Sequence, residues 1–120
     1  MQVLVDTDIL IAYTKGRDFG LNSILTKDPC ICPVTVSEFL NDKFLNSEFK
    51  YKQSVEMLDN FRVLDINRSI GEIAGAILRK GECPHLGDSI IGATALFYNL
   101  SLFTNNKKHF KKITGIKFYR

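Results

Sequence analysis

The chain has 120 residues, of which 45% are hydrophobic and 24% charged, and its formal net charge is +3. This composition is typical of one compact folded domain and excludes a disordered or fibrous protein. The chain opens without a secretory signal pattern, and its longest weakly polar stretch, 89–98, is shorter than the roughly 20 residues of a membrane span, so we expect a cytoplasmic protein.

The spacing of apolar residues predicts strands and helices that alternate along the chain. The clearest amphipathic pattern follows Asn67, which is expected to cap a helix, and ends before Gly81. In chain order, the predicted elements are a strand over 2–5, helices over 8–13 and 19–26, a strand over 30–34, a helical pattern from Val36 to Phe44, a helix over 51–59, a strand over 61–64, the helix after Asn67, a buried helix over 87–98 that begins at Asp88, a strand over 101–104 and an edge strand over 116–119.

This alternation predicts an α/β protein in three layers, with a parallel sheet covered by helices on both faces. We find no linker, repeat or change of composition, so residues 1–120 are expected to form a single domain. Ligands of open parallel sheets bind at the carboxyl ends of the strands. Candidate functional residues are therefore expected at that edge.

Acidic residues occur where the predicted strands end. Asp6 ends the first strand, Glu38 follows the second, and Asp88 begins the buried helix. Three carboxylates at one edge would repel one another unless a hard cation such as Mg²⁺ or Mn²⁺ lies between them. Such an ion activates water and stabilises charge on a phosphoryl oxygen. The pattern therefore predicts metal-dependent hydrolysis of a phosphodiester.

Each of these acidic residues also has a purely structural interpretation. Asp6 or Asp8 could cap the helix that follows the first strand, and Asp88 could cap the buried helix. Thr35 and Glu38 have the spacing of a capping box, in which the glutamate would close the start of a helix. No single residue therefore establishes a functional site.

The histidines and cysteines give weaker signals. His85 and His109 stand in polar turns without a partner at metal-ligand spacing, and we interpret both as surface residues. Cys30, Cys32 and Cys83 are odd in number and match no common zinc spacing. We interpret the cysteines as reduced thiols.

The C-terminal segment 105–120 contains no acidic residue. Clustered basic residues beside an acidic site suggest a polyanion held by its phosphates, although lysine runs are more often only a solvated surface. The candidates for contact with RNA are Lys107, Lys108, Lys111 and Lys112.

Taken together, four segments resemble the motifs of the PIN domain family, in the family's order and over nearly the whole chain. They are V-D-T-D-I-L-I over 5–11, V-S-E-F-L over 36–40, G-D-S-I-I-G-A-T-A-L over 87–96 and T-N-N-K-K-H-F over 104–110. The resemblance implies a sheet of order 3-2-1-4-5 and Mg²⁺- or Mn²⁺-dependent cleavage of RNA.

The resemblance also implies roles for individual residues. Asp6, Glu38 and Asp88 would be the catalytic carboxylates and the metal ligands. The fourth acidic position of the family is matched by Asn106, which can hydrogen-bond a metal-bound water but adds no charge, so binding of a second metal would be weakened. The residues that would support the site are Thr7, Asp8 and Thr104.

Short single-domain members of this family are usually toxins paired with an antitoxin. The resemblance therefore implies a VapC-like toxin ribonuclease whose partners are RNA and an antitoxin protein, and we also consider a homodimer. An antitoxin could place an apolar stretch on the helices between 36 and 59 and an arginine in the acidic pocket. The large apolar residues that such a stretch would contact are Phe44, Phe49, Tyr51 and Met57.

Three other functions remain open at this point. A PIN nuclease could serve in housekeeping RNA processing, and Asn106 also leaves room for a non-catalytic PIN-like module that binds RNA or protein. The pairs Asp6 with Asp8 and Gly87 with Asp88 resemble motifs of haloacid dehalogenase phosphatases, but Gly92 stands where that family has a final aspartate.

Overall fold

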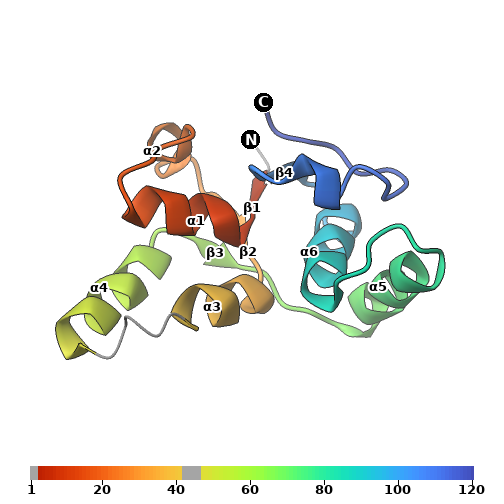
Figure 1. Ribbon diagram of the computed structural model, residues 1–120, viewed down its shortest axis with the longest axis horizontal. Helices are drawn as coiled ribbons and strands as arrows, with labels where there is room; N and C mark the ends of the chain where they lie inside the picture. Colours follow the sequence, from red (N-terminus) through yellow and green to blue (C-terminus); the bar gives the residue numbers. More distant parts are fainter. Residues whose placement is uncertain (1–2, 42–46) are drawn as a thin grey trace.

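The computed structural model describes residues 3–41 and 47–120 (Figure 1). The strands in this part of the chain are β1 (Val3–Val5), β2 (Cys30–Ile31), β3 (Arg62–Val63) and β4 (Ser101–Phe103). The helices are α1 (Thr7–Thr14), α2 (Leu21–Ile24), α3 (Pro33–Leu40), α4 (Glu48–Leu58), α5 (Arg68–Arg79) and α6 (Leu86–Phe97), and a short 3₁₀ helix, η2, covers Lys107–His109.

The described strands form one parallel sheet of order β3-β2-β1-β4. Leu4 of β1 pairs with Cys30 on one side and with Leu102 on the other. The predicted fifth strand over 116–119 is wrong as a strand, because it reduces to one parallel bridge between Leu102 and Phe118. β4 has only three residues and so offers little backbone for a further partner. The predicted α/β class with a parallel sheet is confirmed.

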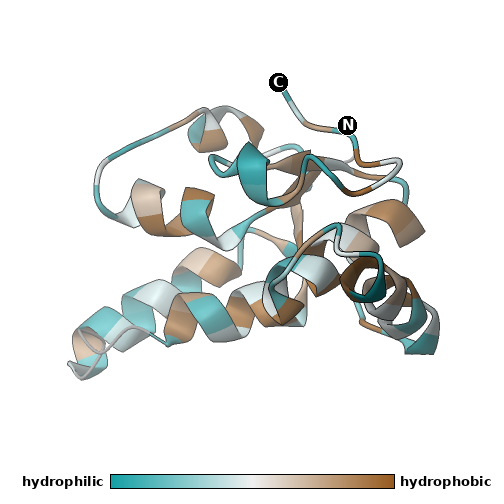
Figure 2. Ribbon diagram, turned by 45° about the vertical axis from the view of Figure 1, so that its right-hand side comes forward, coloured by the Kyte–Doolittle hydropathy of each residue, from teal (hydrophilic) through white to brown (hydrophobic). Residues whose placement is uncertain are grey.

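Helices cover both faces of the sheet because side chains alternate along each strand. Leu4 faces a core that includes Ile70 of α5 and Ile91 of α6, whereas its neighbours Val3 and Val5 face the core of α1, α2 and α3. Figure 1 shows this division, with α5 and α6 side by side on one side of β1 and α1 to α4 on the other. In Figure 2 the strands at the centre are hydrophobic, whereas more hydrophilic residues lie on the outer surfaces of the helices.

The junction between β2 and α3 differs from the prediction. The strand ends at Ile31 instead of residue 34, and α3 begins at Pro33. Proline suits the first turn of a helix because its missing N–H would have no partner there in any case. Thr35 is consequently inside the helix and fully buried, so the predicted capping box of Thr35 and Glu38 is wrong. Glu38 therefore does not close a capping box.

Of the caps predicted at the acidic residues, the one at Asp6 is confirmed and the one at Asp88 is wrong. Asp6 caps α1, whereas Asp8 lies inside its first turn. α6 begins at Leu86 with His85 as its N-cap, so Asp88 also lies in a first turn and caps nothing. Carboxylates in this position are favoured by the free N–H groups of the helix start. The predicted cap Asn67 is confirmed, since its Oδ1 accepts a hydrogen bond of 2.9 Å from Ile70 N.

Other boundaries shift by a few residues. The helix predicted over 19–26 is restricted to α2, and the one predicted over 51–59 starts earlier, after the N-cap Ser47. The predicted continuation of α3 to Phe44 lies outside the described residues. Cys30, Cys32 and Cys83 are free thiols buried in the core on the α5 and α6 side. None of the described helices has the length and apolar character needed to cross a membrane.

Candidate active site

Asp6 lies where β1 passes into α1, and it is only 6% exposed. Its backbone N–H donates to Phe103 O of β4, its Oδ1 accepts from Thr7 N at 2.8 Å, and its Oδ2 accepts from Thr104 Oγ1 at 2.8 Å. Burial, together with the charge of Asp8, raises the pKa of Asp6 from 3.8 to about 7. The fold therefore fixes this carboxyl group firmly in a place where its negative charge is poorly stabilised.

Asp8 stands one residue beyond Thr7 in the first turn of α1. Its Oδ2 accepts a hydrogen bond of 3.1 Å from Asn105 N. Its Oδ1 is buried and, among the described residues, has no hydrogen-bond partner. Burial raises the pKa of Asp8 as well. A buried carboxylate oxygen without a donor is the kind of group that a bound cation would satisfy.

Glu38 reaches the same region from α3. Its side chain is exposed, and its Oε1 accepts a hydrogen bond of 2.6 Å from Thr7 Oγ1. The N-terminal turn of α6 comes close, because a Cβ atom placed on Gly87 would lie 3.0 Å from Glu38 Oε2. The glycine therefore allows α6 to approach α3 without displacing the carboxylate.

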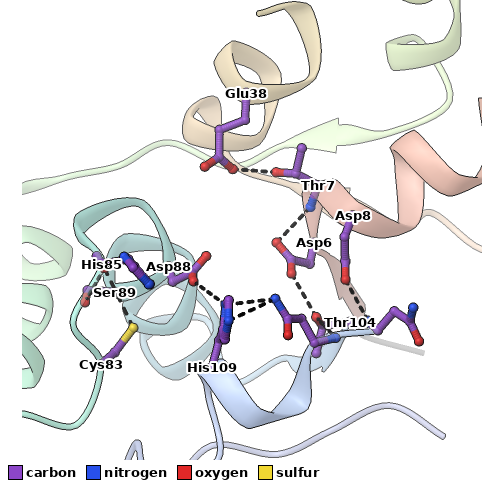
Figure 3. A network of polar contacts seen from close by, with 12 residues as sticks. Asp6, Thr7, Asp8, Glu38, Cys83, His85, Asp88, Ser89, Thr104 and His109 are labelled. Atoms are coloured by element: carbon purple, nitrogen blue, oxygen red, sulfur yellow. Dashed lines mark hydrogen bonds and ion pairs between the residues drawn. The ribbon is translucent and has the colours of Figure 1, made fainter. Parts of the chain in front are cut away.

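Asp88 and His109 meet on the opposite side from Asp6 (Figure 3). Asp88 Oδ2 lies 3.1 Å from His109 Nδ1, and Asn106 Nδ2 lies 2.8 Å from the same nitrogen. Asn106 is held by its backbone N–H, which donates to Thr104 Oγ1 at 2.9 Å. The interpretation of His109 as a surface residue is therefore wrong, whereas His85 is exposed as predicted. The i to i+3 spacing of Asn106 and His109 after a strand end is the sequence signal that could have revealed the contact between these two residues.

These side chains line a single cavity of about 300 Å³. Its walls come from the end of β1, α1, α3, the start of α6 and the segment that enters η2. Thr104 supports the cavity from behind without lining it, and the four candidate lysines are exposed outside it. The lining residues are Asp6, Thr7, Asp8, Ile11, Glu38, Asp88, Asn106 and His109.

The donor atoms around the cavity suit a hard divalent cation. Carboxylate and amide oxygens predominate, and Asp8 Oδ1 is buried without a hydrogen-bond donor. Burial raises the pKa of Asp6, an effect that a bound cation would offset. Within residues 3–41 and 47–120, no three Asp, Glu, His or Cys side chains are gathered within reach of one ion as they stand. The arrangement therefore fits an ion held by one or two side chains and completed by water, as is usual for Mg²⁺.

The chain is similar to known proteins in both sequence and structure. The chain is 30% identical to Ribonuclease VapC1 of Methanocaldococcus jannaschii, over 98% of this chain and 87% of the relative. It is 29% identical to Ribonuclease VapC10 of Mycobacterium tuberculosis, over 96% and 90% of the two chains. A toxin-antitoxin complex from Klebsiella pneumoniae has a chain of similar structure, with a TM-score of 0.78, 28% identity, and coverage of 95% of this chain and 94% of that one. The family model of the PIN domain matches residues 3–116, and the chain therefore belongs to the PIN domain family.

Proposed function

We propose that this protein is a divalent-metal-dependent endoribonuclease and the toxin of a toxin-antitoxin pair. The observation that carries the proposal is the convergence of Asp6, Glu38 and Asp88 on one cavity at the carboxyl edge of a parallel sheet. The relatives named as ribonucleases, which match nearly the whole chain, support the choice of RNA as substrate.

The metal would be Mg²⁺ or Mn²⁺, and Asp6, Asp88 and Glu38 would hold it directly or through water. When bound, such an ion lowers the pKa of a coordinated water and stabilises negative charge on the phosphate. Burial and the neighbouring charge of Asp8 disfavour the ionised form of Asp6 in the protein alone. A cation would offset both effects, which gives the protein a physical reason to bind one.

The surrounding residues hold the carboxylates in place. Thr104 donates to Asp6 and accepts from the backbone of Asn106, so one hydroxyl links two residues of the cavity. Thr7 donates to one oxygen of Glu38 and leaves Oε2 available. We assign to Glu38 the orientation of the attacking water, because it is the most exposed of the three carboxylates.

The RNA would reach the cavity along its basic margin. Lys107 and Lys108 lie in η2, immediately after Asn106, and Lys111 and Lys112 follow within one further turn. All four side chains are exposed and therefore available to phosphates. The acidic cavity would repel a phosphodiester without a metal, and flanking lysines would compensate for that repulsion.

The antitoxin would cover the apolar surface of α4 and reach into the cavity. Among residues 47–58, Phe49 is 69% exposed and Tyr51 is 46% exposed, although both are large and apolar. Tyr51 and Val55 are one helical turn apart, lie on the same face of the helix and are both exposed. Met57 instead packs partly against the core, and Phe44 lies outside the described residues. An arginine of the antitoxin could pair with the carboxylates and displace the metal.

A ribonuclease assay with and without EDTA tests the proposal. Purified protein should cleave RNA when Mg²⁺ or Mn²⁺ is present, and EDTA should abolish cleavage. Asp6→Asn, prepared in parallel, should be inactive, which excludes a contaminating nuclease. Equal cleavage by wild type and Asp6→Asn would contradict the assignment. An inactive wild type with metal would favour a non-catalytic PIN-like module.

Growth measurements separate the toxin from a housekeeping nuclease. Expression of the wild type alone should arrest growth, and Asp88→Ala should relieve the arrest. Co-expression with the neighbouring reading frame should give a tight inactive complex that Phe49→Glu weakens. Harmless expression with no co-purifying partner would favour housekeeping RNA processing. The haloacid dehalogenase interpretation is wrong, because the chain belongs to the PIN domain family.

A further inference from the structure

His109 occupies a place in the cavity for which the proposed reaction gives it no role. η2 begins after Asn106 and carries the His109 ring to the first turn of α6, opposite Asp6 and Asp8 (Figure 3). The His109 side chain is 35% exposed and that of Asp88 is 18% exposed, so both are partly shielded from water. The ring therefore provides a nitrogen that could ligate a metal in a cavity otherwise lined by oxygen atoms.

The contacts of the ring show which direction its Nδ1 faces. Asn106 Nδ2 lies 2.8 Å from Nδ1 but also only 3.3 Å from Nε2. The lone pairs of the two ring nitrogens diverge in the ring plane, so a group close to both cannot lie along either one. The amide therefore contacts the ring from the side of its face. The in-plane direction of Nδ1 is left to Asp88 Oδ2, 3.1 Å away.

At 3.1 Å, His109 Nδ1 and Asp88 Oδ2 are at hydrogen-bond distance, and a cation could take the place of the proton that they share. Adjacent ligands of an octahedral cation with bonds of about 2.1 Å lie about 3.0 Å apart. The separation of Asp88 Oδ2 and His109 Nδ1 matches this spacing. Across the cavity, the buried Asp8 Oδ1 has no hydrogen-bond donor among the described residues, so positive charge near it would be favourable.

We propose that His109 is a nitrogen ligand of the divalent cation, paired with Asp88, and that it makes this site prefer Mn²⁺ over Mg²⁺. Mg²⁺ takes oxygen ligands almost exclusively, whereas affinity for imidazole increases along the first-row transition metals. The inference rests on the proposed metal site, and it adds a ligand and a metal preference to that site.

The chain offers a direct test because it contains only two histidines. Untagged protein loaded with Mn²⁺ can be studied by pulsed electron paramagnetic resonance, which detects the magnetic coupling of the metal to a ligated nitrogen. Wild type should show imidazole coupling, and His109→Gln should lose it. His85→Gln is the matched control, because His85 is exposed and outside the cavity lining, and it should keep the coupling.

Calorimetry measures the metal preference in the same variants. His109→Gln should bind Mn²⁺ about tenfold or more weakly, whereas its affinity for Mg²⁺ should change less than about threefold. Glutamine retains an N–H that can donate to Asp88, so a role restricted to orienting Asp88 would largely survive the change. An equal loss of affinity for both metals would overturn the proposed preference.

The resonance measurement also distinguishes two kinds of failure. Mn²⁺ bound without nitrogen coupling, or with coupling that persists in His109→Gln, would overturn the ligand assignment and leave the proposed nuclease intact. Failure of wild type to bind Mn²⁺, or equal binding by Asp6→Asn, would overturn the proposed metal site together with this inference. If His109→Gln does not fold, ¹⁵N-histidine labelling of His85→Gln gives the same answer, since His109 is then the sole labelled residue.

Discussion

The wall of the cavity formed by β1 and α1 is fixed by backbone hydrogen bonds, whereas the wall formed by α6 and η2 is held by side chains. Asp6 is 6% exposed, bonded through its own N–H to Phe103 O and through its carboxylate to Thr7 N. Asp88 and His109 are more exposed and contact each other through side-chain atoms. The first wall cannot change without disturbing the sheet.

This difference in how the side chains are held indicates that the two walls have different roles. The α1 wall supplies a carboxylate whose buried charge is unfavourable until a cation arrives. The α6 wall carries residues that can be exchanged without loss of the fold, because their contacts are made by partly exposed side chains. Substitutions on the first wall should therefore alter stability and activity together, whereas those on the second should alter activity and metal preference alone.

Asp6→Asn should have the largest effect on cleavage. Loss of this carboxylate should reduce the cleavage rate more than about 100-fold, because even groups that only orient metal ligands contribute 10-fold to 100-fold. Single-turnover cleavage of a labelled RNA at saturating Mn²⁺ measures the rate. Asp88→Asn should also be impaired, but less strongly than Asp6→Asn. A residual rate within tenfold of the wild type would contradict the role of Asp6.

The same variant should be more stable than the wild type at neutral pH without metal. The pKa of Asp6 is raised in the folded protein to about 7, so the folded state binds its proton more tightly than the unfolded state does. The free energy of unfolding of the wild type should therefore fall as pH rises from about 4 to about 7. Asp6→Asn lacks this carboxyl group, so at pH 7.5 its free energy of unfolding should exceed that of the wild type by about 1–3 kcal/mol.

Urea unfolding at pH 4 and pH 7.5 measures this difference. The advantage of Asp6→Asn should disappear at pH 4, where the wild-type carboxyl group is already protonated, and Asp88→Asn should show no comparable advantage. Addition of Mn²⁺ should stabilise the wild type more than Asp6→Asn. An advantage that is the same at both pH values would show that the charge of Asp6 is not its cause.

Thr104→Val should have the next largest effect. The Thr104 hydroxyl bonds both Asp6 Oδ2 and Asn106 N, and it is 6% exposed. Its loss should slow cleavage about 10-fold to 100-fold and lower the free energy of unfolding by about 1–3 kcal/mol. Thr7→Val removes the bond to the exposed Glu38 and should alter stability less. Similar unfolding curves for the two variants would show that the two hydrogen bonds of the buried Thr104 hydroxyl contribute no more to stability than the single bond from Thr7 to Glu38.

Gly87→Ala should affect cleavage with little change in stability. A Cβ atom there would lie 3.0 Å from Glu38 Oε2, the end of a flexible side chain that can move aside. The free energy of unfolding should stay within about 0.5 kcal/mol of the wild type, whereas displacement of Glu38 should slow cleavage about tenfold. Gly71→Ala on α5 is the matched control, because it meets no atom within 4 Å and should leave cleavage unchanged.

The α1 wall could be predicted from sequence because its signals are local. An apolar strand that stops at Asp6 indicates both the strand end and the carboxylate. Pro33 is also a local signal, because proline suits the first turn of a helix, and it places Thr35 inside α3 and not at its cap. The pairing of Asp88 with His109 could not be predicted in this way, because it joins residues 21 positions apart through a 3₁₀ turn. The burial that raises the pKa of Asp6 likewise depends on the assembled sheet.

The lysines beside the second wall should give the smallest effect. Lys111 and Lys112 are exposed and follow η2, so they can contact phosphates of an RNA whose scissile group lies in the cavity near His109. Replacing both with alanine should weaken RNA binding and flatten its salt dependence by about 1–2 units of slope, because each phosphate contact on a single strand contributes roughly 0.7. Lys50 and Lys52 on α4 are also exposed and form the matched pair, for which the slope should not change. Binding measured from low to moderate salt, with an inactive Asp6→Asn background to prevent cleavage, gives the slope directly. If replacement of either pair reduces the slope equally, the lysines act only through net charge, and Lys111 and Lys112 do not form a specific contact surface for RNA.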